Sequence, residues 1–456
     1  MTKIGDWFVW DVVYIFREVL RGITLARNKY GKIDSIGVAT WGVDFGLFSS
    51  EGVLLNDVLA YRNEIGGTYF DKLSEQEKKT YFELTGILSD KINSAYLLQG
   101  IRDKLPTVYK NATRLLMISD ILNYYLTGTM INEPSMLSTT QLLDVKTQTI
   151  SKDICHKFDL RSDLFGEISN HGESIGFLKP EIIEELQLDG HIPVISIPSH
   201  DTAAAVLAVP ALPGERFAFL SSGTWSLLGM ELDDALINEK VFEGGFTNEI
   251  GAFGKITLLK NNMGLFLLQR LKQEYEFEQG KVCTWDEFYS LRSNYKNRDS
   301  LLFDVNAREF FNPISMLDAI LNTITDAGAK VIPSEQKWDI AISAAIESLA
   351  CSYAIGVEKL ESATCKKIDK IYVVGGGTRD RELNQLTANS TGRPVILGSP
   401  ESTSLGNILA QSGYLAGYSI EKMRSIVRNS YPPLVIETQN DPIHNDVVRR
   451  YRELIE

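Results

Sequence analysis

Apolar residues recur at helical spacing near the start of the chain. Within residues 11–29 they lie three or four positions apart, as on the buried face of an amphipathic helix. The pattern predicts a helix over this segment that ends at Gly31. Residues 33–40 are a short, apolar, β-rich run and predict a buried strand, and residues 43–48 predict a second strand.

Residues 75–126 predict a helical region, in which residues 115–126 are the most regular amphipathic segment and Gly128 marks their end. Residues 194–197 predict a short strand. This strand leads into Pro198-Ser199-His200-Asp201, after which residues 202–209 predict a helix.

In the second half of the chain, two predicted strands each end in a glycine turn. Residues 216–221 lead into Ser222-Gly223-Thr224, and residues 368–374 lead into Gly375-Gly376-Gly377. Because strands alternate with helices in both halves, the pattern predicts an α/β fold with ligands near the carboxyl ends of strands. Further segments of note are a long predicted helix at 334–360, a shorter one at 381–391 and a proline-containing linker at 209–215.

The composition is that of a globular protein, and the length of 456 residues indicates two or three domains. The formal net charge is −13 and the pI is about 5.1. This acidic excess argues against nucleic acid or an anionic membrane surface as the main partner. No apolar run reaches the roughly 20 residues of a membrane span. Asp6 and Asp11 interrupt the apolar N-terminal stretch, so we expect no signal peptide.

The four cysteines have no spacing typical of a zinc site. They predict reduced thiols in a cytoplasmic protein. Cys351 and Cys365 are near enough in sequence that a bond between them stays open.

The two glycine turns are candidates for phosphate binding. The chain has neither a G-x-x-x-x-G-K-[ST] loop nor a G-x-G-x-x-G turn after a strand, and Asp44-Phe45-Gly46 has no H-R-D loop to accompany it. Backbone N–H groups and hydroxyls at residues 221–224 suit phosphate oxygens. Three glycines at 375–377 let a planar or phosphorylated ligand approach the backbone. The alternatives are an ordinary strand-end turn and a flexible loop.

Two further groups carry candidate chemistry. Asp201 stands at a strand end before a helix, where it could accept a proton from a substrate hydroxyl or could serve as the helix N-cap. Trp41 and Asp44 supply an indole and a carboxylate, a pair that suits a sugar, although a core tryptophan is the alternative.

Taken together, the motifs resemble the FGGY carbohydrate kinases, most of all the members that phosphorylate L-rhamnulose. The resemblance runs in family order from about residue 5 to residue 450. The segments that carry it are Thr40–Gly46, Ala60–Arg62, Ser138–Asp144, Ser199–Ala203, Ser221–Leu227, Phe246–Glu249, Leu258–Asn261, Gly264–Gln269, Val373–Gly377, Leu383–Ala388 and Ser404–Asn407.

The resemblance implies two actin-like (ribonuclease H-like) ATPase domains with a cleft between them, at residues 1–212 and 213–456. It implies ATP-dependent phosphorylation of the 1-hydroxyl of L-rhamnulose, with Asp201 as the general base and magnesium bridging the ATP phosphates. No residue is assigned as a metal ligand. The sugar contacts are expected from His200, Thr202, Asn261, Gly67 and Trp41, with Thr68 an alternative to Gly67. The ATP contacts are expected from Gly223, Thr224, Gln269, Gly376 and Asn384.

The sequence also departs from the family pattern. The family's N-terminal strands and their D-x-G-x-S-S-x-R loop have no counterpart, so we expect the first domain to lack these strands. Ala39 replaces the usual Asp before Thr-Trp-Gly, and Asn63-Glu64-Ile65-Gly66 replaces Asp-x-Arg-Thr. Two alternatives therefore stay open: an inactive or sugar-binding-only relative, and a kinase for L-fuculose or D-xylulose.

Overall fold

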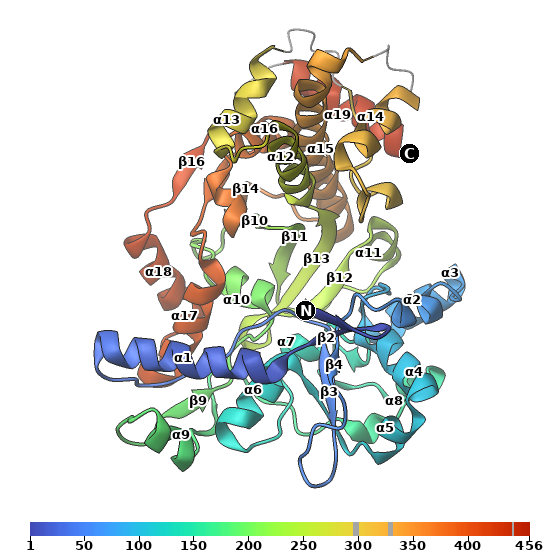
Figure 1. The fold of residues 1–456 in the computed structure, drawn as a ribbon. Helices are drawn as coiled ribbons and strands as arrows, with labels where there is room; N and C mark the ends of the chain where they lie inside the picture. Colours follow the sequence, from blue (N-terminus) through green and yellow to red (C-terminus); the bar gives the residue numbers. More distant parts are fainter. Residues whose placement is uncertain (295–300, 327–331, 440–441) are drawn as a thin grey trace. The chain divides into compact units, whose positions relative to one another are not determined.

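The computed structural model describes residues 1–294, 301–326, 332–439 and 442–456 (Figure 1). The chain forms two compact units, each built from segments distant in sequence. Unit 1 contains Met1–Ala208, Glu231–Leu259 and Ser402–Val427. Unit 2 contains Val209–Met230, Lys260–Glu401 and Arg428–Glu456.

Unit 1 begins with an antiparallel hairpin of β1 (Thr2–Ile4) and β2 (Trp7–Trp10), which β4 (Val58–Leu59) extends to three strands. Helix α1 (Val12–Tyr30) follows. Asp11 caps its first turn by accepting a hydrogen bond from Tyr14 N at 2.9 Å, and Gly31, at φ 83°, ends it. The prediction of this helix is confirmed.

The strand predicted at residues 33–40 does not form among the described strands. The segment makes only two isolated parallel bridges, Ile36 to Val194 and Thr40 to His200. Between them the Gly37 carbonyl accepts a hydrogen bond from Asn407 Nδ2 at 2.9 Å. The Asn407 side chain thus bonds to a carbonyl group that, in a continuous strand, would accept a hydrogen bond from a neighbouring strand.

The predicted helical region at 75–126 contains four helices and one strand. The helix predicted at 115–126 begins later than expected, because residues 114–117 form β5, which pairs antiparallel with β3 (Phe45–Phe48). Gly128 ends the helix at φ 83°, as predicted. The elements are α3 (Glu75–Thr85), α4 (Ser94–Lys104), α5 (Pro106–Asn111), β5 (Arg114–Met117) and α6 (Ile118–Thr127).

The remaining helices and strands of unit 1 include α10, which starts at Asp201. They are α2 (Glu64–Phe70), α7 (Pro134–Leu137), β6 (Leu143–Asp144), β7 (Thr149–Ile150), α8 (Lys152–Lys157), β8 (Ser174–Phe177), α9 (Pro180–Glu185), β9 (Pro193–Ile195), α10 (Asp201–Leu207), α11 (Glu239–Gly244), β12 (Thr247–Ile250) and α17 (Ser402–Ala416). Helix α18 (Ile420–Ser430) belongs to this unit as far as Val427.

The largest sheet is mixed and has the strand order β12-β13-β11-β10-β14-β15-β16. Strand β10 (Phe217–Ser222) pairs parallel with β14 (Lys370–Val374), which pairs parallel with β15 (Val395–Leu397). The antiparallel pairs are β10 with β11 (Trp225–Leu232), β12 with β13 (Ile256–Met263), and β15 with β16 (Leu434–Ile436). The sheet confirms the predicted α/β class.

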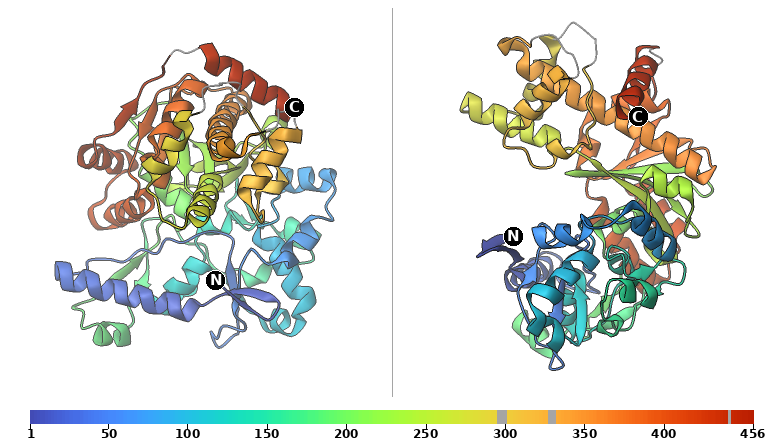
Figure 2. Two further views of the ribbon diagram at one scale, coloured as in Figure 1. Left: turned by 45° about the horizontal axis from the view of Figure 1, so that its top comes forward. Right: turned by 90° about the vertical axis from the view of Figure 1, so that its right-hand side faces the viewer.

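Helix α15 (Lys337–Thr364) is the core helix of unit 2 (Figure 2). It packs on β11, where the Tyr353 and Ser226 hydroxyls lie 2.7 Å apart and a Cβ at Gly356 would approach Leu228 to 2.5 Å. Its apolar window is long enough to cross a membrane, but 94% of that window is buried inside the protein. The expectation that no apolar segment reaches the length of a membrane span is therefore wrong for α15, whose apolar character is explained by its place in the core.

Five more helices complete the described part of unit 2: α12 (Phe266–Gln279), α13 (Trp285–Ser290), α14 (Met316–Asp326), α16 (Arg381–Thr391) and α19 (Pro442–Ile455). The α16 bounds match the prediction, and Asp380 caps its first turn by accepting from Leu383 N at 3.0 Å. All four cysteines are free thiols, so the possible bond between Cys351 and Cys365 does not form.

Candidate active site

Asp201 is the first residue of α10, and its side chain is half-exposed. The N-cap position belongs to His200, so the interpretation of Asp201 as the N-cap is wrong. The Asp201 carboxylate accepts a hydrogen bond from Thr202 Oγ1 at 3.2 Å. It therefore lies at the start of a buried helix with part of its surface open to solvent, as a general base requires.

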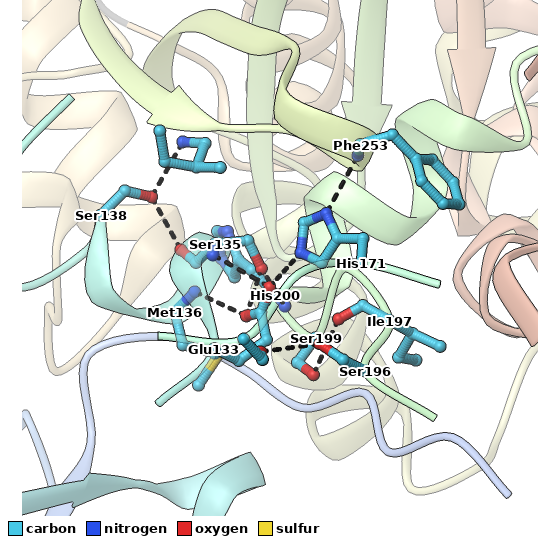
Figure 3. A network of polar contacts seen from close by, with 12 residues as sticks. Glu133, Ser135, Met136, Ser138, His171, Ser196, Ile197, Ser199, His200 and Phe253 are labelled. Carbon is cyan, nitrogen blue, oxygen red and sulfur yellow. Dashed lines mark hydrogen bonds and ion pairs between the residues drawn. The ribbon is translucent and has the colours of Figure 1, made fainter. Parts of the chain in front are cut away.

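The backbone around His200 is fixed from two sides. Ser135 Oγ accepts a hydrogen bond from His200 N at 3.0 Å (Figure 3). Thr40 N donates to the Ser199 carbonyl at 2.8 Å, and Asp201 N donates to the Thr40 carbonyl at 2.9 Å. These bonds hold the short turn between β9 and α10 in one conformation.

The His200 ring lies between two carboxylates. Its Nδ1 is 3.1 Å from Glu249 Oε2, and its Nε2 is 3.5 Å from Asp201 Oδ1. Burial lowers the pKa of His200, but the negative charges of Glu249, Asp201 and Glu133 outweigh burial and raise this pKa to about 9. The carboxylates around the ring therefore favour its protonated form.

A buried hydrogen-bond network around Glu133 supports the turn that carries His200 (Figure 3). Glu133 accepts hydrogen bonds from Ser135 N at 3.0 Å, Ser135 Oγ at 2.6 Å and Met136 N at 2.9 Å. It also contacts His171 Nε2. Because His171 Nδ1 accepts from Phe253 N at 2.9 Å, the proton of a neutral ring must sit on Nε2, facing Glu133. Four donors thus surround one buried carboxylate.

Trp41 lies beside this turn, but Asp44 does not offer its carboxylate to a ligand. Asp44 is fully buried, and its Oδ2 accepts from both Trp10 Nε1 and Trp41 Nε1 at 2.6 Å. Tyr61 N donates to Oδ1 at 2.7 Å. Burial raises the pKa of Asp44 to about 6, while these three hydrogen bonds act in the opposite direction. The interpretation of Asp44 as an acceptor for sugar hydroxyls is wrong, because its oxygens serve the protein itself.

The two indoles that share Asp44 stack with ring centroids 4.3 Å apart. Sequence reasoning named Trp41 and missed Trp10, although Trp10 lies in an aromatic run, Trp7-Phe8-Val9-Trp10, directly before α1. Both indoles are half-buried. Gly42, the residue after Trp41, lies against His200, since a Cβ at Gly42 would lie 3.3 Å from His200 Cδ2.

The backbone that joins Trp41 to Asp44 is strained. Val43 is β-branched yet has a φ of 66°, a conformation that such residues rarely adopt. Thr139 Oγ1 accepts from Val43 N at 2.9 Å, and Ser94 Oγ donates to the Val43 carbonyl. Two buried hydroxyls thus hold the strained residue that turns Asp44 inward.

Gly67 lies in α2, and a Cβ there would meet nothing within 4 Å. The nearby Asn63, which replaces the family's usual Asp, has a structural role. Its side chain accepts from Phe8 N at 2.8 Å and donates to the Phe8 carbonyl at 2.7 Å, so it ties α2 to the N-terminal hairpin.

In unit 2, the two glycine turns predicted from sequence lie next to each other. Strands β10 and β14 are parallel neighbours with Ser221 opposite Val374. Both turns therefore follow the carboxyl ends of these strands, at the same end of the sheet. A Cβ at Gly375 would lie 3.0 Å from the Ser222 carbonyl oxygen, and one at Gly377 would lie 2.0 Å from Ser222 Oγ. Gly375 also has a φ of 82°. The glycines are therefore required for the turns to pack together.

The outer side of this pair of turns is open. A Cβ at Gly376 would meet nothing within 4 Å, and one at Gly223 would meet only the Trp225 carbonyl oxygen, at 3.7 Å. Thr224 is exposed between β10 and β11. Leu265 N donates to the Gly223 carbonyl at 2.9 Å, which fixes the first turn. Exposed backbone and a hydroxyl on rigid turns can receive phosphate groups.

The remaining predicted residues lie at varied depths. Asn384 on α16 is buried, and its Nδ2 donates to the Gly377 carbonyl at 2.9 Å, so it shapes the second turn. Gln269 on α12 is half-buried, and Asn261 on β13 is exposed. Among the described residues, no group of three or more His, Cys, Asp or Glu could hold a metal ion.

Sequence comparison identifies the family. The model of the N-terminal domain of the FGGY family of carbohydrate kinases matches residues 1–208, and that of the C-terminal domain matches residues 218–413. The chain belongs to the FGGY family of carbohydrate kinases. It is therefore a sugar kinase with the two-domain fold of this family, and the family implies ATP and a sugar as its substrates.

Two curated relatives are rhamnulokinases. That of Bacteroides thetaiotaomicron is 35% identical over 439 residues, which cover 95% of this chain and 87% of the relative. That of Oceanobacillus iheyensis is 33% identical, covering 94% of this chain and 89% of the relative. The solved gluconate kinase of Lactobacillus acidophilus shares the fold, with a TM-score of 0.82 at 17% identity over 100% of this chain and 90% of that one.

Proposed function

We propose that the protein transfers the γ-phosphate of ATP to the 1-hydroxyl of L-rhamnulose, with Asp201 as the general base. The observation that carries the choice of sugar is the identity of 35% to a curated rhamnulokinase over 95% of the chain. The half-exposed Asp201 carboxylate at the start of α10 supports the choice of base.

In this proposal Asp201 removes the proton as the sugar oxygen attacks the γ-phosphorus. The bond between that phosphorus and the β–γ bridging oxygen breaks, and ADP leaves with the bond electrons. His200 and Thr202 flank the base, Trp41 offers an apolar surface, and Asn261 and Gly67 supply further sugar contacts. Positioning and charge neutralisation account for most of the rate in phosphoryl transfer.

For ATP, the proposal assigns phosphate binding to Gly223 and Thr224, the adenosine to Gly376, and further contacts to Gln269 and Asn384. The absence of any close neighbour for a Cβ at Gly376 leaves its backbone accessible, which supports this assignment. Magnesium would neutralise the ATP phosphates. It is typically held by one or two carboxylates together with the phosphates themselves, and the half-exposed Asp201 side chain fits such a role.

We further propose that residues 1–212 form the sugar-binding domain and residues 213–456 the nucleotide-binding domain in chain order. The matches of the two family models, which end at residue 208 and begin again at residue 218, support this division. The reduced cysteines and the kinase relatives support a cytoplasmic location.

A coupled assay of ADP release over a panel of ketoses, including L-rhamnulose, L-fuculose and D-xylulose, tests the proposal. We expect the largest kcat/KM with L-rhamnulose and a 1-phosphate product. A larger value with another ketose would replace the sugar, and sugar binding without turnover on any member would indicate a binding protein.

The base is tested separately by Asp201→Asn. A general base contributes about 10²- to 10⁴-fold to rate, so we expect a loss of kcat in that range. Calorimetry with ATP in the absence of magnesium should show unchanged affinity, because Asp201 lies outside the glycine turns. Turnover close to that of the unchanged protein would exclude Asp201 as the base.

A further inference from the structure

Ser135 is a fully buried serine whose hydroxyl has no role in the family assignment or in the proposed reaction. Its Oγ accepts a hydrogen bond from His200 N at 3.0 Å, across 65 positions of the sequence. His200 is the N-cap of α10, and its side chain makes no cap bond, so the start of this helix depends on contacts from other segments. The Ser135 hydroxyl is such a contact, directly before Asp201.

Two consecutive amide groups set the position of the Asp201 backbone. Asp201 N donates to the Thr40 carbonyl at 2.9 Å, and His200 N donates to Ser135 Oγ. The first acceptor is a backbone group, which a substitution at Thr40 would keep. The second acceptor is a side-chain group, which a substitution at Ser135 can remove. The contribution of the Ser135 hydroxyl to the position of Asp201 can therefore be measured by mutation.

The orientation of the Ser135 hydroxyl is fixed by Glu133 (Figure 3). A serine hydroxyl has one hydrogen, and Ser135 Oγ donates it to Glu133 Oε2 at 2.6 Å. The lone pairs of Oγ are then left to face His200 N, which can only donate. Because the hydroxyl cannot rotate without losing the bond to Glu133, it offers His200 an acceptor in one fixed place.

Glu133 is itself held firmly. Its Oε1 accepts from Ser135 N at 3.0 Å and contacts His171 Nε2, and its Oε2 accepts from Met136 N at 2.9 Å. Its backbone N donates to Asp120 Oδ1 at 3.2 Å. The side chains of Glu133 and His171 are only 3% and 2% exposed, so the network is closed to bulk solvent. The carboxylate that orients the Ser135 hydroxyl therefore has one position.

We propose that Ser135 is a positioning residue for phosphoryl transfer, which holds the start of α10 so that the Asp201 carboxylate stays within reach of the sugar hydroxyl. This inference rests on the proposed role of Asp201 as the base. Ser135 acts only through the backbone of His200 and contacts no substrate. A misplacement of about 1 Å can cost about 10²-fold in rate, so one hydrogen bond to this turn can control catalysis.

The test is Ser135→Ala, which leaves His200 N without its acceptor. We expect kcat, referred to the folded fraction, to fall by about 10- to 10²-fold. The KM for the ketose should stay within about twofold, because the base acts in the transition state and not in substrate binding. A kcat within about twofold of the unchanged protein, or a raised KM with the same kcat, would overturn the proposal.

Ser348 of α15 provides the matched control. It is as fully buried as Ser135, and its Oγ accepts from a distant backbone amide, Phe303 N, at 3.1 Å. Ser348→Ala and Ser135→Ala should lower Tm by similar amounts, about 2–6 °C, since each leaves one buried amide unpaired. Only Ser135→Ala should lower kcat. An equal loss of kcat in both variants would show that the rate follows stability, and the proposal would fail.

Two conservative variants test the same hydrogen bond. Ser135→Thr keeps the hydroxyl and should return kcat to within about threefold of the unchanged protein. Ser135→Cys has nearly the shape of serine but only a weak acceptor, so it replaces Ser135→Ala if that variant does not fold. We expect Ser135→Cys to lose at least about threefold in kcat. A folded Ser135→Thr as slow as Ser135→Ala, or a Ser135→Cys as fast as the unchanged protein, would contradict the proposal.

A double variant separates this inference from the choice of base. If Ser135 acts through Asp201, adding Ser135→Ala to Asp201→Asn should lower kcat by less than about twofold further. A further tenfold loss would show that Ser135 acts independently of the base and would overturn the inference, while Asp201 would remain the base. Unchanged turnover of Asp201→Asn would instead overturn the base, and the inference with it.

Amide hydrogen exchange at His200, followed by NMR, gives a readout that does not depend on turnover. Ser135→Ala should speed this exchange at least about tenfold, because the amide loses its partner, whereas Ser348→Ala should leave it unchanged. Unchanged exchange in Ser135→Ala would overturn the inference even if Asp201 is the base.

Discussion

Gly406 of α17 lies so close to Ala204 of α10 that a Cβ at Gly406 would stand 1.8 Å from the Ala204 carbonyl oxygen. Three residues before Gly406, Thr403 Oγ1 donates to the Asp201 carbonyl at 3.1 Å. The same face of α17 therefore sets both the depth of α10 and the position of its first residue. No side chain can be added at this contact without moving the helix that carries Asp201.

Gly406→Ala should destabilise the protein by about 2 kcal/mol, because the two helices must separate to admit the methyl group. It should also lower kcat, since α10 moves with Asp201. Urea unfolding and the ADP-release assay measure the two effects. Gly22→Ala in α1 is the matched control: its Cβ meets nothing within 4 Å, so alanine should stabilise that helix by up to about 1 kcal/mol. Equal stability changes in the two variants would contradict the contact.

Gly376→Ala tests the nucleotide assignment without disturbing the fold. A Cβ at Gly376 meets no protein atom within 4 Å, so thermal unfolding should be unchanged within error. If ATP lies against this backbone, the methyl group should weaken ATP binding about tenfold, measured by calorimetry, with sugar binding unaffected. Unchanged ATP affinity would place the nucleotide elsewhere.

Arg424 and Glu231 form a buried ion pair within unit 1, at 2.9 Å and 3.1 Å, with side chains 10% and 13% exposed. Arg424 also donates to the Val206 carbonyl in α10 at 3.2 Å. Arg424→Met should cost about 3 kcal/mol, because it leaves Glu231 buried and unpaired. The double variant with Glu231→Met should recover much of this loss in a double-mutant cycle. Additive losses would show that the two residues are not coupled.

The folding stability should depend on the charge of His200. The pKa in the folded protein, about 9, lies above the ordinary value of 6.5. The stabilising contribution is therefore complete below pH 6.5 and is lost as pH rises through 9, by at most about 3 kcal/mol. Urea unfolding of the unchanged protein should show this slope between pH 6.5 and 9.5, and His200→Gln should lack it. Parallel pH profiles would contradict the prediction.

Elements whose signals are local could be predicted from sequence. Helices α1 and α16 were expected at nearly their observed bounds, because Asp11 and Asp380 cap them and a glycine ends each one. The strand expected at residues 33–40 does not form, and in the middle of this segment the Gly37 carbonyl accepts a hydrogen bond from Asn407, a residue 370 positions later in the chain. The hydrophobic pattern depends only on the segment itself, whereas strand pairing also depends on the residues that lie beside the segment in the fold.

The candidate site also contains some residues that the local sequence could indicate and others that it could not. The glycine turns could be found from sequence because their strand context is local, and the structure brings them together on β10 and β14. Asp44 could not be assigned correctly, since its buried state depends on Trp10 and Tyr61. His171 gave no usable signal, because a single His shows its role only through the residues it faces.

The discontinuity of unit 1 also governs the order in which the protein can fold during synthesis. Helix α10 is buried from Thr202 to Leu207, and α17, which covers it, begins roughly 200 residues later in the chain. At about 5–20 residues per second, the ribosome needs roughly 10–40 seconds to reach α17 after α10 has emerged. The apolar side chains of α10 therefore lack the cover of α17 during this interval, and unit 1 can reach its final packing only after α17 has emerged.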